Sequence, residues 1–128
     1  MRAGRRLNLG FTLIELLVVM AIIALLLTLA SPRYFSHVDK AREDVLREDL
    51  YLMRDAIDKH YMDRGQYPDQ LEDLVAYKYL RAVPVDPYTG SRTSWVLVPV
   101  TDDSPGIIFD VKTASGEKGR DGSALKDW

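Results

Sequence analysis

The sequence predicts an α+β fold in which one long N-terminal helix packs on a small antiparallel sheet. An apolar block covers residues 11–30 and is broken only by Thr12, Glu15 and Thr28. A helical pattern with one apolar face comes next and continues to Arg64. Two short runs rich in β-branched and aromatic residues lie near the C-terminus. A chain of 128 residues has room for one small domain and an anchor.

The apolar block has the length of a membrane-spanning helix. Twenty residues at helical rise span about 30 Å, which matches the hydrocarbon core of a bilayer. Arg2, Arg5 and Arg6 precede the block without a balancing acid. The positive-inside rule therefore predicts a cytoplasmic N-terminus and export of the residues C-terminal to the block. A secretory signal peptide fits less well, because its apolar core is only about 7–15 residues long.

The second half of the long helix is predicted to be amphipathic. Pro32 is expected to kink or weaken the helix, since proline lacks an N–H group. Gly65 is expected to end it. Charged residues from Asp39 to Glu48, and also His60, are predicted to lie on a hydrated face. The residues predicted to face the core are Leu46, Leu50, Met53, Ile57 and Tyr61, with Val38, Ala41 and Val45 on an adjoining track.

The C-terminal half is predicted to contain a short helix and a hairpin. The helix begins near Pro68, and Leu71, Leu74 and Val75 form its inner face. The strands are expected at 94–98 and 106–112, and a turn-rich tail comes after them.

Composition excludes several classes of protein. The formal net charge is −2, which does not suit a general nucleic-acid binder. The chain has no cysteine, so disulfides and thiol catalysis are excluded. We find no nucleophile–base pair, phosphate-binding loop or metal triad in the sequence, and we expect no enzyme.

Glu15 is the residue that a plain anchor does not explain. A carboxylate in hydrocarbon costs at least a few kcal/mol unless it is paired, and the apolar block contains no Lys, Arg or His. Cleavage after Gly10 would supply a partner, because it would free the α-amine of Phe11 at the start of the helix. Between subunits, this charge pair would set the axial register of one helix against the next.

The string Gly10-Phe11-Thr12-Leu13-Ile14-Glu15 resembles the prepilin signal of the type IV pilin superfamily letter for letter. The resemblance implies a pilin-like fold, cleavage between Gly10 and Phe11 by a prepilin peptidase, and N-methylation of Phe11. It also implies assembly into a helical filament, in which Glu15 and Pro32 take part.

Further residues resemble the major, G-type pseudopilins of type II secretion systems. They are Tyr67-Pro68, Val83-Pro84-Val85-Asp86-Pro87 and Trp128. This likeness implies a structural subunit of a secretion pseudopilus, anchored in the bacterial inner membrane with its C-terminal domain in the periplasm. The implied partners are further copies of the chain, minor pseudopilins, an inner-membrane assembly platform and the peptidase/methyltransferase.

The resemblance divides the chain into three parts. Residues 1–10 are a basic leader that is removed, residues 11–31 are the transmembrane and assembly helix, and residues 32–128 are the periplasmic domain. G-type pseudopilins bind calcium in a C-terminal loop. The matching oxygens here would come from Ser115, Glu117, Asp121 and Asp127, and the alternative is a solvated, glycine-rich turn.

Two other functions stay open at this point. One is a type IV pilus subunit for adhesion, motility or DNA uptake. The other is a single-pass membrane protein whose periplasmic domain binds a ligand or a partner. Glu15 separates this last function from the filament functions, because a plain anchor should tolerate Glu15→Leu and a filament subunit should not.

Overall fold

A computed structural model describes residues 10–128. The predicted leader, residues 1–10, therefore lies outside the described residues except for Gly10. The chain divides into two units with the boundary between His37 and Val38, and each is described by itself below.

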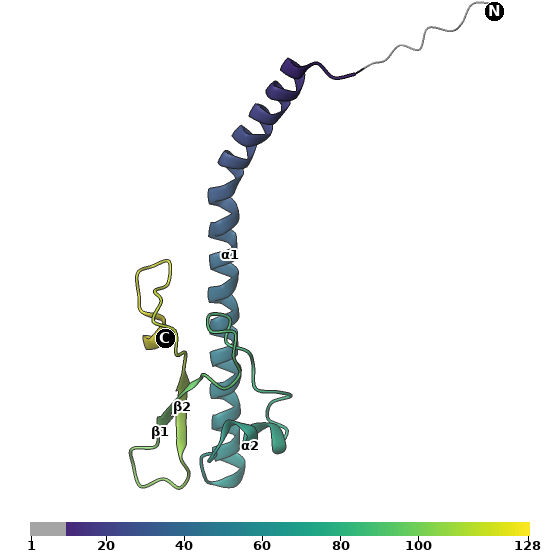
Figure 1. The fold of residues 1–128 in the computed structure, drawn as a ribbon. Coiled ribbons are helices and arrows are strands. Elements are labelled where there is room, and N and C mark those ends of the chain that lie inside the picture. The colour runs from purple at the N-terminus through teal and green to yellow at the C-terminus, as the bar shows by residue number, and fades with distance from the viewer. Residues whose placement is uncertain (1–9) are drawn as a thin grey trace, which may run out of the picture. The chain divides into compact units, whose positions relative to one another are not determined.

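The elements confirm the predicted α+β fold (Figure 1). Helix α1 covers Leu13–Arg64 and α2 covers Leu71–Ala76. Strands β1 (Val96–Pro99) and β2 (Ile108–Lys112) form a two-stranded antiparallel sheet. A short 3₁₀ helix, Leu125–Asp127, lies at the end of the chain.

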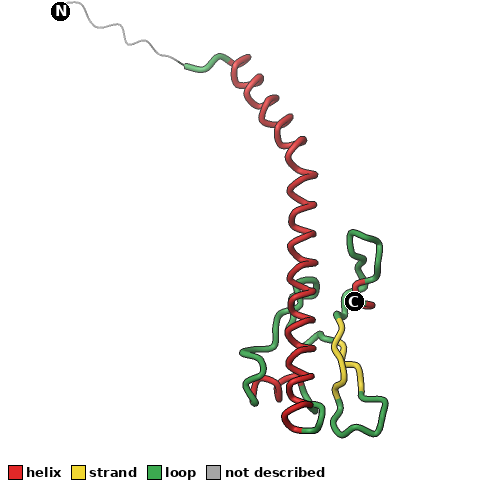
Figure 2. The backbone as a smooth tube through the Cα atoms, turned by 180° about the vertical axis from the view of Figure 1, so that it is seen from behind, coloured by secondary structure: helices red, strands yellow, loops and turns green. Residues whose placement is uncertain are grey.

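In the unit from Val38 to Trp128, α2 and the hairpin lie on opposite sides of the C-terminal part of α1 (Figures 1 and 2). The core joins these elements to Trp95 and to the C-terminal tail, residues 113–128. Its buried apolar residues are Leu46, Leu50, Met53, Ala56, Ile57, Leu71, Leu74, Trp95, Ile108, Val111 and Leu125. Four of the five predicted inner residues of α1 are therefore confirmed, while Tyr61 is 37% exposed.

Two polar residues of α1 correct the predicted hydrated face. Glu43 is 4% exposed and His60 is 2% exposed. Both continue the spacing of three and four residues that the apolar stripe follows, so the helix turns them toward the core. His60 donates from Nδ1 to the carbonyl oxygen of Gln66 at 2.7 Å, which satisfies the buried ring. The predicted adjoining track was also wrong. Val38, Ala41 and Val45 were expected to face the core, but they are exposed.

Local signals set the ends of both helices. Gly65 has a φ of +71°, and its N–H donates to the carbonyl oxygen of Tyr61 at 2.8 Å, which ends α1 as predicted. At the start of α2, the carboxylate of Asp73 accepts the N–H groups of Asp69 and Gln70, each at 3.1 Å. A carboxylate at a helix N-terminus also interacts favourably with the helix dipole.

The hairpin is held to α1 by Arg54. Its Nε donates to Asp110 Oδ1 at 2.7 Å, and its Nη2 donates to the main-chain oxygens of Val111 and Trp128 at 3.1 and 2.6 Å. One guanidinium thus fixes β2 and the last residue of the tail against the same turn of α1. Strand β1 begins two residues later and ends one residue later than predicted. Strand β2 begins two residues later than predicted and ends at Lys112, as predicted.

We expect Gly106→Ala to destabilise the domain by about 2 kcal/mol. Gly106 has a φ of +106°, and a Cβ there would overlap the carbonyl group of Tyr67. The loop would have to move and break the 2.8 Å hydrogen bond from Tyr67 N–H to the carbonyl oxygen of Pro105. Urea unfolding of the full chain in detergent, followed by tryptophan fluorescence, measures the loss.

Gly90→Ala is the matched control for this substitution. Gly90 also has a positive φ, +71°, but a Cβ there would meet nothing within 4 Å. The strain of a left-handed residue alone costs about 1 kcal/mol. Equal losses in the two variants would show that the close approach to Tyr67 contributes nothing.

Candidate assembly and processing site

The peptide bond between Gly10 and Phe11 lies outside the helix. Residues 10–12 have no regular secondary structure, and Phe11 is 86% exposed. A Cβ on Gly10 would meet nothing within 4 Å, so the described structure gives no steric reason for a glycine at this position. The bond is open to a protease in this arrangement.

Glu15 closes a capping box with Thr12. Thr12 Oγ1 accepts the N–H of Glu15 at 3.2 Å, and Glu15 Oε2 accepts the N–H of Thr12 at 3.4 Å. Such a pair satisfies two of the N–H groups that the start of a helix leaves free. The carboxylate is therefore directed back to residue 12, one residue from the nitrogen that cleavage after Gly10 would free.

The capping role of Thr12 was missed in the sequence, although its signal is present. Thr12-Leu13-Ile14-Glu15 has the Ser/Thr-x-x-Glu pattern that precedes many helices. Glu15 can therefore have two separate roles. Its acceptor oxygens serve the helix start within one subunit, and its charge is available to a partner.

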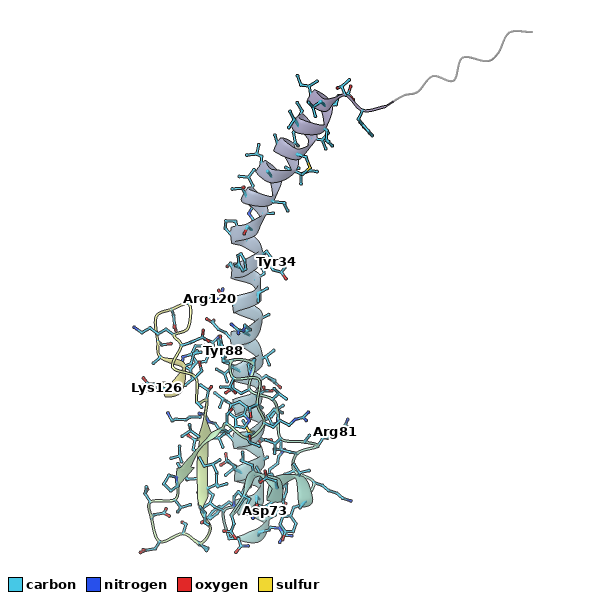
Figure 3. The ribbon with its side chains drawn as sticks, in the orientation of Figure 1. Tyr34, Asp73, Arg81, Tyr88, Arg120 and Lys126 are labelled. Atoms are coloured by element: carbon cyan, nitrogen blue, oxygen red, sulfur yellow. The ribbon has the colours of Figure 1, made fainter. Side chains whose placement is uncertain are left out.

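The apolar side chains in the first half of α1 are exposed in the described structure. The large side chains of this half are all about half exposed or more, for example 76% for Leu13 and 66% for Leu29. In the view of Figure 3 they project from both flanks of the helix. By its length and composition, the helix could cross a membrane. A helix that is apolar all round needs lipid or other helices around it.

Pro32 lies inside α1, and the helical pattern continues through it. Proline cannot donate the main-chain hydrogen bond that another residue would make at this position. The role of Pro32 in assembly stays a prediction.

Two of the four predicted calcium ligands, Ser115 and Asp121, accept hydrogen bonds from neighbouring residues. Ser115 is buried, and its Oγ accepts the N–H of Glu117 at 3.2 Å. Asp121 Oδ1 accepts both the N–H and the hydroxyl of Ser123, at 2.9 and 2.6 Å. These two hydrogen bonds lower the pKa of the Asp121 carboxyl. Asp127 is exposed in the 3₁₀ helix.

No three acidic or histidine side chains within residues 10–128 form a group that could hold a metal ion. Calcium takes six to eight oxygen ligands and usually several carboxylates. The described tail therefore holds no preformed cluster of carboxylates, and calcium binding stays a prediction.

Comparison with known proteins shows which family the chain belongs to. The prokaryotic N-terminal methylation motif matches residues 5–31. The type II secretion system core protein G of Pseudomonas aeruginosa is 32% identical, and the match covers 97% of each chain. This chain belongs to the core protein G family. Members of this family are type IV pilin-like major pseudopilins, so the predicted superfamily and the predicted subtype are both confirmed.

Other relatives in the core protein G family agree. The protein from Vibrio cholerae is 30% identical over 89% of this chain and 86% of its own length. The protein from Escherichia coli is 30% identical over 62% of this chain and 66% of its own length. No solved structure gave a significant match.

Proposed function

We propose that this chain is a structural subunit of a type II secretion pseudopilus, with no catalytic role of its own. The observation that carries the proposal is the half-exposed apolar segment of α1, which begins in a methylation motif and contains a single acid. The core protein G relatives support the same function. The folded domain from Val38 to Trp128 is then the part that the filament displays outside the bilayer.

Processing is proposed to come first. A prepilin peptidase cuts between Gly10 and Phe11, and a methyltransferase then modifies the new α-amine of Phe11. The exposed, non-helical Gly10–Phe11 bond supports this step. The peptidase, rather than the fold, would require the glycine, since space around Gly10 is open.

Assembly is proposed to depend on the charge of Glu15. In the membrane its carboxylate needs a cation, and the described part of the apolar helix supplies none. The freed amine of Phe11 provides this cation, either in the same subunit or in a neighbour. Copies of one chain that meet head to tail without closing into a ring form a helical filament.

Before assembly the subunit is proposed to lie in the bacterial inner membrane. The arginines of the leader favour a cytoplasmic N-terminus, and the domain formed by residues 32–128 would then lie in the periplasm. Its partners are then other copies of itself, minor pseudopilins, an inner-membrane assembly platform and the peptidase/methyltransferase.

A gene deletion tests this function in the organism of origin. We expect the deletion to block export of secreted proteins through the outer membrane, and the wild-type gene to restore it. Normal secretion together with a loss of adhesion, twitching or DNA uptake would contradict the proposal and indicate a pilus subunit. Normal behaviour in all of these assays would contradict a filament function.

A further inference from the structure

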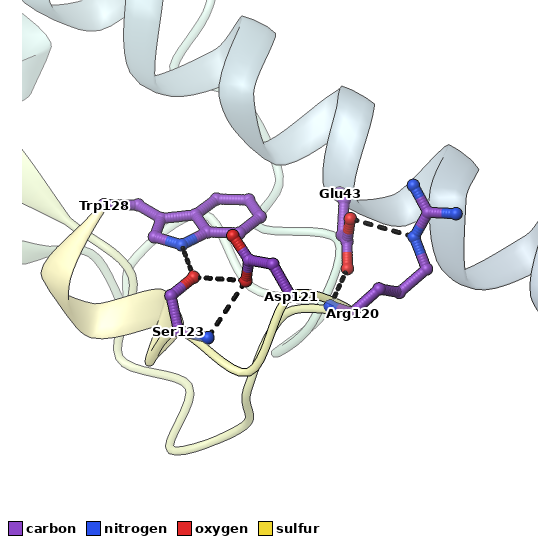
Figure 4. Close-up of polar contacts among 5 residues, drawn as sticks. All are labelled: Glu43, Arg120, Asp121, Ser123 and Trp128. Carbon is purple, nitrogen blue, oxygen red and sulfur yellow. Dashed lines mark hydrogen bonds and ion pairs between the residues drawn. The ribbon is translucent and has the colours of Figure 1, made fainter.

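A buried carboxylate of α1 contacts the C-terminal tail (Figure 4). Glu43 Oε1 accepts the main-chain N–H of Arg120 at 2.6 Å, and Glu43 Oε2 accepts from Arg120 Nε at 3.1 Å. The two residues lie 77 positions apart in the sequence. A buried charge is tolerated only when it is paired and hydrogen-bonded, and Arg120 provides both.

A second set of contacts orders the tail from within. Asp121 Oδ1 accepts the hydroxyl proton of Ser123 at 2.6 Å, and Ser123 Oγ accepts the indole N–H of Trp128 at 2.8 Å. The main chain closes the same loop, because Gly119 N–H donates to the carbonyl oxygen of Ser123 at 2.8 Å. The guanidinium of Arg47 lies 4.3 Å from the centre of the Trp128 ring, and Leu125 is fully buried in the core.

We infer that protein contacts, centred on the Glu43–Arg120 ion pair and the Asp121–Ser123–Trp128 hydrogen bonds, hold the C-terminal tail in place of a calcium ion. Two of the four side chains predicted to bind calcium, Ser115 and Asp121, already accept hydrogen bonds within the tail. No buried side-chain nitrogen or oxygen in residues 10–128 lacks a hydrogen-bond partner. The inference concerns folding of the subunit and does not depend on the proposed function.

The electrostatics of Glu43 agree with a stabilising contact. Burial raises the pKa of its carboxyl, but the hydrogen bonds and the charge of Arg120 outweigh burial, and the pKa is lowered overall. A carboxyl whose pKa is lowered by folding stabilises the protein above its unfolded pKa, and this contribution is lost as the pH falls through the folded pKa. The other charged or titratable groups near Glu43 are Asp39, Arg42, Arg47, Tyr88, Glu117 and Lys118.

Hydrogen exchange of the mature, full-length protein in detergent tests the inference. Mass spectrometry of peptides from 117–128 reports the tail, and a peptide that contains β2 reports the fold. We expect the unmutated tail to be equally protected with excess calcium and with EGTA. Protection that requires calcium would overturn the inference, and this comparison needs no variant.

Glu43→Ala tests the ion pair itself. Hydrogen bonds to charged groups contribute enough that its loss should speed exchange in the tail by roughly 10- to 100-fold, with β2 much less affected. Asp44→Ala is the matched control, because Asp44 is the neighbouring acid of α1 and is exposed. Equal tail exchange in the two variants would overturn the role of Glu43.

Discussion

Glu15→Gln is expected to abolish polymerisation while leaving the start of α1 intact. Glutamine can replace glutamate in a capping box, so the hydrogen bonds with Thr12 are retained. What the variant removes is the negative charge. Where that charge pairs with the amine of a neighbour in the bilayer, its loss leaves the amine unpaired, and an unpaired charge in hydrocarbon costs at least a few kcal/mol. Filaments sheared from overproducing cells, counted by electron microscopy and by sedimentation, measure the effect.

Thr12→Ala is the complementary variant. It removes the hydroxyl that accepts the N–H of Glu15 and keeps the charge. Loss of an N-cap costs about 1 kcal/mol, which should weaken the helix start but leave most of the assembly. Filaments from Glu15→Gln together with none from Thr12→Ala would show that Glu15 acts only as a helix cap.

Leu46→Ala is expected to lower the free energy of unfolding by about 2–5 kcal/mol. Leu46 is fully buried, and it packs in the core that α1 shares with α2, β2 and Leu125. The truncated side chain would leave a cavity that the surrounding helix and sheet cannot fill completely. Urea unfolding of the full chain in detergent, followed by the fluorescence of buried Trp95, gives the difference.

Val45→Ala is the control, because it shortens an apolar side chain at the same place in the helix but on its exposed face. Val45 is next to Leu46 but is 48% exposed, and a surface substitution of this kind changes stability by at most about 0.5 kcal/mol. Similar losses in the two variants would contradict the placement of the core stripe along α1.

The sequence predicted the buried apolar residues in the middle of the α1 stripe, but not the two buried polar residues at its ends. Residues 46, 50, 53 and 57 follow helical spacing and are apolar, so the pattern alone identifies them. Glu43 and His60 obey the same spacing, but their polarity assigned them to the surface. Their polar groups are satisfied by Arg120, which lies 77 positions from Glu43, and by the main chain of Gln66, just beyond the end of α1. The helical spacing of α1 reveals neither contact.

In the candidate site and the tail, too, short local motifs could be predicted, whereas contacts formed by the folding of a loop could not. Gly10, Phe11 and Glu15 could be predicted because a short contiguous motif and an acid in an apolar helix are visible in any sequence. The Asp121–Ser123–Trp128 contacts of the tail were not predicted. They depend on how the loop from Gly119 to Ser123 closes, and a turn-rich sequence does not determine which side chains such a loop brings together.

The N-terminus of the mature protein tests the central claim most directly. Intact mass and N-terminal sequencing should be done on protein from cells that contain their native peptidase. Gly10→Val serves as the control, because the described structure has open space at this position and only processing should fail. We expect a chain that begins at Phe11 and carries one N-methyl group, and an uncut variant. A chain that still begins at Met1, or one cut after Ala30, would contradict a pseudopilin that is processed for assembly.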